Sequence, residues 1–175
     1  MKGKFEIIMA GSGGQGLVSC GIVLAEAAII EGQNAVQTQS YGIASRGGFS
    51  KSEVIISQDE IIFQQVQEPD VILALTEQAM EMYAGKQNNI PVFYDSTLLK
   101  AREGENLFGF PFTELANKLG HVGTANTIAL GAMAAKTGMV KVESLVQVLK
   151  NRFSGKVADM NVNALSKGVE LVKNS

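Results

Sequence analysis

Residues 5–10, FEIIMA, run without a break into residues 11–16, GSGGQG, and this junction decides the fold. The mostly apolar first segment predicts a short strand, and the apolar residues 17–31 beyond the glycines have the length and composition of a buried helix. Gly32 is typical of the position just after a helix, and residues 35–38 then predict a second strand. We therefore expect the chain to begin with a β-α-β unit.

The later segments extend this unit into a mixed sheet. Residues 53–56 predict a strand that follows the second one too closely for a crossover helix, so we expect it to run antiparallel. The continuous apolar run at 71–75 is typical of a strand buried on both faces of a parallel sheet. Further elements are predicted as a strand at 90–94 and helices at 77–83, 113–119, 124–136, 142–153 and 163–173, with Thr124 as an N-cap. Residues 1–175 are expected to form a single α/β domain with a mostly parallel sheet.

The charge content limits the classes of partner. The 15 Lys and Arg against 17 Asp and Glu give a net charge of −2, so the attraction to phosphate backbones that drives nucleic-acid binding is missing. Only 18% of the residues are charged, below the roughly 25% typical of soluble domains. Residues 33–49 and 120–133 together contain one Lys, Arg, Asp or Glu, namely Arg46. We expect these segments to form a weakly charged surface that is buried in a hetero-oligomer and causes self-association of the isolated chain.

Cys20 is the only cysteine in the sequence. A single thiol excludes an internal disulfide and any iron–sulfur or zinc site that needs several thiolates from this chain, which suits a reducing compartment. Cys20 lies near the start of the first helix, where a thiolate could be stabilised, but a small apolar core residue is the favoured interpretation. The apolar stretches are too short to span a bilayer or to form a signal peptide. We expect a soluble cytoplasmic protein that contacts neither membrane nor nucleic acid.

The first glycine loop has the pattern G-x-G-x-x-G, placed between a strand and a helix. Its candidate ligand-binding residues are Gly11, Ser12, Gly13, Gly14, Gln15 and Gly16. Glycines let the backbone approach an anion, and the helix start directs N–H groups and a partial positive charge at it. The alternative is that these glycines only pack the helix closely on the strand. A ribose-binding acid is missing from residues 35–40, so we expect no binding of NAD or NADP.

A second glycine-rich segment, SYGIASRGG at 40–48, follows the second strand. Its candidate binding residues are Tyr41, Arg46, Gly47 and Gly48. Parallel strands place their carboxyl ends at one edge of a sheet, so this loop should lie beside the first. The Arg46 guanidinium could there bind a phosphate or carboxylate through two hydrogen bonds. The alternative is a structural arginine that binds backbone carbonyls or a partner subunit.

Three other polar residues carry weaker hypotheses. His121 is the only histidine, and no neighbouring carboxylate or serine pattern supports a catalytic role. Asp95 follows the strand at 90–94 and could meet a ligand, but an N-cap or turn role is favoured. Asn126 lies among Ala, Gly and Met and is interpreted as a buried amide that fixes the position of a helix or meets a partner.

The two glycine segments, GSGGQG at 11–16 and S-Y-G-x-x-x-R-G-G at 40–48, resemble the gamma subunit of 2-oxoacid:ferredoxin oxidoreductases. The strand at 52–56 follows them, as in that family. The likeness continues through three later motifs, PFTELA at 111–116, NTIALG at 126–131 and NVNALSKG at 161–168. The family often has Pro-Glu where this chain has Ile43-Ala44, so no carboxylate role is expected at position 44. The 2-oxoglutarate-type complexes look most similar.

The resemblance implies a non-catalytic subunit of an oxidoreductase. Complexes of this family oxidatively decarboxylate a 2-oxoacid on thiamine diphosphate, pass electrons through iron–sulfur clusters to ferredoxin and release an acyl-coenzyme A. With one cysteine and no Gly-Asp-Gly motif, this chain leaves the thiamine diphosphate, Mg²⁺ and 4Fe–4S clusters to alpha, beta and delta partners. The chain itself is expected to bind no cofactor or metal tightly and to contribute to a coenzyme A site.

The resemblance also implies a three-layer α/β domain with a mixed sheet, either open or closed. A rival interpretation from another class is a free-standing nucleotide- or phosphate-binding protein that uses the first glycine loop alone. The two interpretations differ in a simple way, because the subunit needs partners to act, whereas the rival binds ADP or NAD in isolation.

Overall fold

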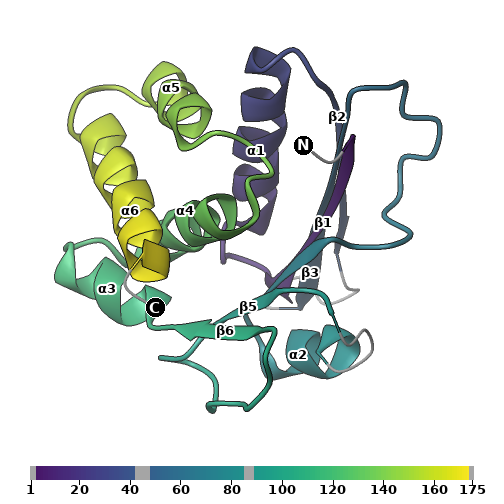
Figure 1. Cartoon of the computed structure of the whole chain (residues 1–175). Helices are drawn as coiled ribbons and strands as arrows, with labels where there is room; N and C mark the ends of the chain where they lie inside the picture. The colour runs from purple at the N-terminus through teal and green to yellow at the C-terminus, as the bar shows by residue number, and fades with distance from the viewer. Residues whose placement is uncertain (1–2, 42–47, 85–88, 174–175) are drawn as a thin grey trace.

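A computed structural model describes residues 3–41, 48–84 and 89–173, and a six-stranded sheet lies at its centre (Figure 1). The strands lie in the order β2-β3-β1-β4-β5-β6. Along the chain the strands are β1 (Lys4–Ser12), β2 (Asn34–Tyr41), β3 (Phe49–Ser57), β4 (Val71–Ala74), β5 (Val92–Asp95) and β6 (Leu107–Phe110). The helices are α1 (Leu17–Ile30), α2 (Glu77–Tyr83), α3 (Phe112–Lys118), the 3-10 helix η1 (Val122–Thr124), α4 (Ala125–Thr137), α5 (Val142–Arg152) and α6 (Gly155–Lys173).

The sheet is mixed and mostly parallel. β3 lies between β2 and β1 and runs antiparallel to both, whereas β1, β4, β5 and β6 pair in parallel. The connection between the second and third strands is too short for a crossover helix, and the predicted antiparallel course of the third strand is confirmed. Among the described strands β2 and β6 are the two edges and no ladder joins them, so the order is that of an open sheet.

One face of the sheet is covered by more helices than the other (Figure 1). α1, α3, α4, α5 and α6 lie on one face, where Ile7, Met9 and Val54 point into the larger apolar core. Ile8 and Ala10 point to the other face and pack with α2 residues Ala79 and Met80 in a smaller core. This arrangement confirms the predicted three-layer α/β domain. None of the helices in the described ranges is long and apolar enough to cross a membrane.

The helix predicted after the glycine loop ends as expected. The N–H of Gly32 donates to the Ile29 carbonyl and that of Gln33 to the Ala28 carbonyl, the bonding pattern of a Schellman motif. At the next predicted helix start the structure differs in detail. Thr124 is the residue before α4, but its hydroxyl donates to the His121 carbonyl and caps no N–H of α4. The turn of η1 brings that carbonyl within reach, and this turn was not evident from the sequence.

Two elements of the structure were not predicted at their true extent. β6 is a four-residue edge strand, and Gly109 within it lies so close to Tyr94 that an added Cβ would meet the Tyr94 hydroxyl oxygen at 2.4 Å. α6 begins at Gly155, eight residues before the predicted start, and its first turn is exposed apart from the buried Ala158. β6 is defined by its pairing with β5, a tertiary contact that the local sequence pattern does not predict.

α4 is a core helix, which corrects the expectation of an exposed surface for most of residues 120–133, whereas residues 120–123 before it are exposed. Every residue from Thr127 to Ala134 is buried within this chain. The low charge of this segment therefore reflects an internal helix. The expectation of a weakly charged surface fits the other segment better, since β2 is an edge strand whose described side chains are partly or fully exposed.

Two glycines allow α4 and α6 to approach closely. A Cβ added at Gly131 would lie 2.2 Å from the Leu165 carbonyl oxygen, and one added at Gly168 would lie 1.9 Å from the Ile128 carbonyl oxygen. Both neighbours are backbone atoms that cannot rotate away. The contact between the two helices therefore requires the absence of a side chain at both positions.

Gly168→Ala should lower the free energy of unfolding by about 2 kcal/mol, because the added methyl group forces α4 and α6 apart. Urea denaturation of the purified chain measures the change. Asn163→Ala, on an exposed position of the same helix, is the matched control and should have little effect. Equal stability of the two variants would show that the close approach of the helices does not constrain position 168.

Candidate binding site at the glycine loops

The two glycine loops are neighbours where β1 ends and β3 begins. Gly11 pairs with Ser50 and Ser12 with Phe49, and the Gly13 N–H donates to the Gly48 carbonyl at 2.9 Å. The predicted juxtaposition is thus confirmed for Gly48. Tyr41, the last residue of β2, pairs with Ser50 at the same edge. Arg46 and Gly47, and the departure at Ile43-Ala44, lie outside the described residues.

Gln15 folds back into the first loop. Its Oε1 accepts from the Ser12 N–H at 2.8 Å, and its Nε2 donates to the Leu75 carbonyl at 3.3 Å. A Cβ at Gly11 would lie 2.2 Å from this Oε1, so the glycine makes room for the amide. Gln15 therefore braces the end of β1 against the residue that follows β4. The Ser12 N–H is satisfied within the loop, which reduces the number of donors left for a ligand.

The backbone N–H groups in the first turn of α1 remain available as hydrogen-bond donors. Gly16 has a φ of 73° and makes no side-chain cap, and among the described residues nothing accepts a hydrogen bond from the N–H groups of Leu17, Val18 and Ser19. Gly13, Gly14 and Ser19 are exposed, so the approach to this end of the helix is open. The helix dipole adds a partial positive charge there. This end of the loop can accept an anion.

Asn126 joins the helix α4 to the glycine loop. Its side-chain Nδ2 donates to the Gly16 carbonyl at 3.2 Å, and its backbone carbonyl oxygen accepts from the Cys20 Sγ at 3.4 Å. A Cβ at Gly16 would lie 2.0 Å from Asn126 Nδ2, so the bond requires a glycine. This contact agrees with the predicted role of fixing the position of the helix, against the glycine loop, although Asn126 is half-buried where a buried amide was expected.

A cavity of about 360 Å³ opens beside this contact, between α1, α4 and α6. Its polar rim includes Ser19, His121, Asn126 and Asn161, and its apolar wall includes Val157. Sequence reasoning did not identify this cavity. A partial signal for it existed, because the motif at 126–131 supplies Asn126, Thr127 and Leu130 to its lining and the motif at 161–168 supplies Asn161.

The remaining predicted candidates have structural roles. Cys20 is buried, and burial raises the pKa of its thiol to about 12, so no thiolate forms near the start of α1. Asp95 is 1% exposed, and its carboxylate accepts hydrogen bonds from the N–H and hydroxyl of Thr113 and from the Thr97 N–H. Asp95 thus closes a turn and caps the start of α3, as favoured from the sequence.

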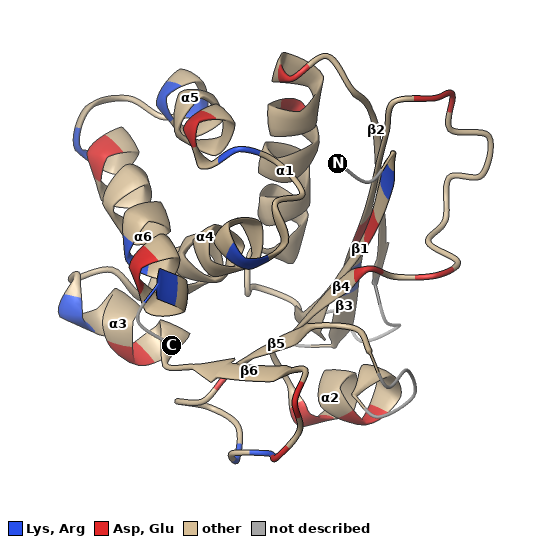
Figure 2. Ribbon diagram, in the orientation of Figure 1, with Lys and Arg blue, Asp and Glu red and all other residues tan. Residues whose placement is uncertain are grey.

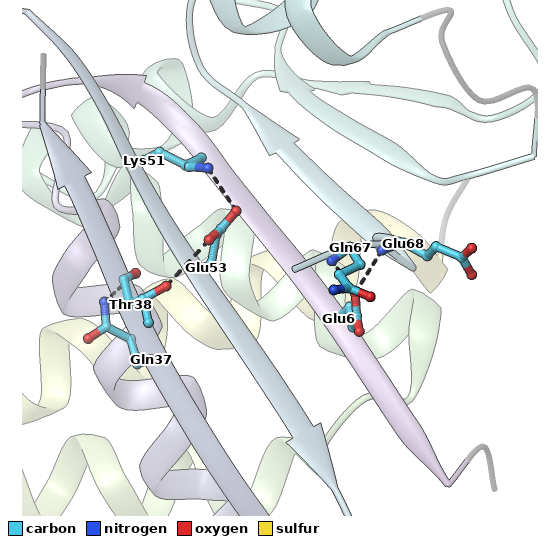
Figure 3. Close-up of polar contacts among 7 residues, drawn as sticks. All are labelled: Glu6, Gln37, Thr38, Lys51, Glu53, Gln67 and Glu68. Atoms are coloured by element: carbon cyan, nitrogen blue, oxygen red, sulfur yellow. Dashed lines mark hydrogen bonds and ion pairs between the residues drawn. The ribbon is translucent and has the colours of Figure 1, made fainter. Parts of the chain in front are cut away.

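The cation of Lys51, close after the second glycine loop, is already neutralised. Its Nζ lies 2.8 Å from Oε1 of Glu53, which is buried on the sheet face opposite α1, and Thr38 also contacts Glu53 (Figure 3). Since Lys51 forms this ion pair, it is not a free cation for a ligand at the glycine loops.

Comparison with known proteins identifies the chain. The family model described as pyruvate ferredoxin/flavodoxin oxidoreductase matches residues 6–171. The chain belongs to this family. It is 41% identical to the 2-oxoglutarate synthase subunit KorC of Archaeoglobus fulgidus over 175 residues, which cover 98% of this chain and 89% of that subunit. The crystal structure of a keto/oxoacid ferredoxin oxidoreductase gamma subunit from Geobacter sulfurreducens is 37% identical, with a TM-score of 0.85 and 98% of both chains covered.

This protein is therefore the gamma subunit of a 2-oxoacid:ferredoxin oxidoreductase, most similar to the 2-oxoglutarate type. The finding replaces the rival interpretation of a free-standing nucleotide-binding protein. The same unit also occurs inside longer relatives. The ketoisovalerate oxidoreductase subunit VorA of Methanothermobacter thermautotrophicus is 36% identical over 173 residues, which cover 95% of this chain but 36% of VorA.

The folded chain should resist thiol reagents at pH 8. With a pKa of about 12, roughly one Cys20 thiol in ten thousand is ionised at that pH, and the side chain is buried. Titration with a chromogenic disulfide should give a reaction only after denaturant is added, with one thiol per chain. Rapid stoichiometric reaction of the native protein would contradict the burial of Cys20.

Proposed function

We propose that the oxidoreductase to which this gamma subunit belongs oxidises 2-oxoglutarate to succinyl-coenzyme A and carbon dioxide, with ferredoxin as the electron acceptor. The observation that carries this choice is the 41% identity to a 2-oxoglutarate synthase subunit over nearly the whole of both chains. The identity to the ketoisovalerate subunit is lower, at 36%. Branched-chain 2-oxoacids are therefore the competing substrates that an assay must include.

The proposed role of this chain within the complex is architectural, without redox chemistry of its own. A 4Fe–4S cluster does not fit it, because a cluster needs several thiolates and the sequence has only the buried Cys20. The sequence also lacks the Gly-Asp-Gly motif that holds thiamine diphosphate and its Mg²⁺ in the partner subunits. The described residues likewise contain no group of three or more His, Cys, Asp or Glu side chains placed for a metal ion. We assign these groups to alpha, beta and delta partners in a cytoplasmic complex that reduces ferredoxin.

We further propose that the glycine loops bind the phosphate groups of coenzyme A. The open N–H groups at the start of α1 and the exposed backbone of Gly13 and Gly14 support this assignment. The assigned residues are Gly11, Ser12, Gly13, Gly14, Gln15, Gly16, Tyr41, Arg46, Gly47 and Gly48. Within this set Gln15 acts as a brace, because its amide makes its hydrogen bonds inside the chain.

The substrate assignment is tested on the native complex. Purified complex should reduce viologen with 2-oxoglutarate in a reaction that depends on coenzyme A, and with a kcat/KM at least about tenfold lower for pyruvate and 2-oxoisovalerate. Each acid is assayed at several concentrations with coenzyme A present or omitted. A higher kcat/KM for either competitor would reject the 2-oxoglutarate assignment and leave the membership in the family unchanged.

Arg46→Lys should raise the apparent KM for coenzyme A about tenfold, because lysine keeps the charge but loses the planar two-donor geometry that binds phosphate. One lost charge-assisted hydrogen bond is worth about 1.5 kcal/mol, which corresponds to that factor. The kcat and the KM for 2-oxoglutarate should not change. Steady-state kinetics of the complex give all three constants.

Arg152→Lys is the matched control for this variant. Arg152 forms a surface ion pair with Glu26 at 2.6 Å, on α5 and α1, and lysine can keep that pair. The control complex should have the wild-type KM for coenzyme A. An unchanged KM in Arg46→Lys, or an equal rise in both variants, would reject the phosphate-binding role of Arg46.

A further inference from the structure

The connection between β3 and β4 is much longer than the geometry requires. β3 ends at Ser57 and β4 begins at Val71, and both positions lie at the same end of β1, on its two sides. Two strand spacings and a three-residue offset along β1 separate them, about 14 Å in all, which about four residues can cross. The connection has 13 residues without helix or strand, and it projects from the side of the sheet (Figure 1). Irregular loops of this length are uncommon and are usually functional.

Both ends of this loop, residues 58–70, are held by hydrogen bonds. At its start the Gln58 N–H donates to the Gly3 carbonyl at 3.1 Å, and Asn34 Nδ2 donates to the Asp59 carbonyl at 3.1 Å. At its end the buried carboxylate of Glu6 accepts from the N–H groups of Gln67 and Glu68, each at 2.8 Å (Figure 3).

The Glu6 carboxylate is itself stabilised in its charged form. Burial raises the pKa of Glu6, but hydrogen bonds from Lys4 and from the Glu68 and Gln67 N–H groups outweigh this and lower it overall. A carboxylate thus stays ionised under the end of the loop and retains both backbone donors. The loop is fixed at its base, so its apex is presented in a defined position.

The apex of the loop is apolar and exposed. Ile62 is 79% exposed and Phe63 is 67% exposed, and they are the two most exposed large apolar side chains in the described parts of the chain. Holding an isoleucine and a phenylalanine in water, on a loop anchored at both ends, forgoes the stabilisation that their burial would give. The described parts of the chain leave these side chains uncovered.

The loop also carries a strong charge of one sign. Residues 58–70 contain Asp59, Glu60, Glu68 and Asp70 and no Lys, Arg or His. The ribbon of the projecting loop carries acidic residues at both ends and no Lys or Arg (Figure 2). A surface that receives this loop must place cations around a site for two apolar side chains.

We propose that residues 58–70 form a docking loop for another subunit of the oxidoreductase, with Ile62 and Phe63 as anchors in an apolar pocket that is rimmed by Lys and Arg. A buried aromatic anchor surrounded by charged pairs is the usual composition of an energetic centre in an interface. The proposal rests on the chain being a subunit of a multi-subunit enzyme. It is independent of the assigned substrate and of coenzyme A binding.

The test is competition during assembly of the complex. Wild-type and variant gamma chains are co-expressed with the partner subunits, and mass spectrometry compares their ratio in purified complex with that in the free pool. Ile62→Ser and Phe63→Ser should each be incorporated about tenfold less than wild type. Ile29→Ser, at another exposed isoleucine, is the matched control and should be incorporated equally. Equal incorporation of the two loop variants would overturn the proposal.

The charge of the loop is tested in the same assay. Glu60→Lys should also be incorporated less than wild type, and the loss should shrink as the salt concentration of the lysate rises. Glu103→Lys, on an exposed segment elsewhere, is the control for a change of net charge. An equal loss in both charge variants would show that net charge, and not this loop, decides assembly, and would overturn the assigned basic rim.

A cross-linking measurement covers the case in which a variant folds poorly. A benzophenone side chain in place of Phe63 keeps the apex aromatic and should form an adduct with a different subunit of the complex on irradiation. The same group in place of the exposed Leu98 is the control. An adduct only with a second gamma chain, or no adduct in the intact complex, would overturn the proposal.

Discussion

β1 is buried on both faces and paired along both edges, and the positions of the other elements depend on it. Ile7 and Met9 reach the large core under the helices, whereas Ile8 and Ala10 reach the small core under α2. Each large apolar side chain that is buried in this way contributes about 1.5–3 kcal/mol. β3 and β4 bind its two edges, so one short segment determines where the antiparallel and the parallel parts of the sheet meet. The glycine loop follows directly from the end of this strand, and its place is therefore fixed by the core.

Some polar groups at the glycine loop make hydrogen bonds within the chain, and others remain open to a ligand. The Gln15 side chain accepts from the Ser12 N–H, and the Asn126 side chain donates to the Gly16 carbonyl. The Gly48 carbonyl accepts from the Gly13 N–H. The contacts of Asn126 and Gly48 join the loop to segments that are far apart from it in the sequence, and the Gln15 contact closes it locally, so the loop is held in place before any ligand arrives. The donors at the start of α1 have no such partner in the described structure. A rigid loop with open donors loses little entropy when it binds an anion.

The low charge of the sequence has more than one structural cause. Part of it belongs to α4, which is internal and packs against α6 through glycines that bring the two backbones together. Another part belongs to β2, an uncharged strand at one edge of the sheet, with no further strand beyond it among the described residues. The projecting loop at 58–70 has the opposite character, with acidic ends and an apolar apex. A subunit can expose such surfaces because other chains of its complex can cover them.

Local sequence determined the elements whose signals are short in range. The strand, glycine loop and helix at 5–31 follow from apolar periodicity and from the backbone freedom of glycine, and the antiparallel course of β3 follows from the length of one connection. The resemblance of the glycine segments was also contained in the sequence, and it identified the family. Tertiary structure alone decided which side chains complete the site. The Gln15 and Asn126 contacts reach partners 60 and 110 residues away. The extra strand β6 depends on its pairing with β5, and the burial of α4 depends on its packing against α6. No local pattern encodes such contacts. The same holds for the loop at 58–70, since its exposed apex results from two anchored ends that only the folded sheet brings together.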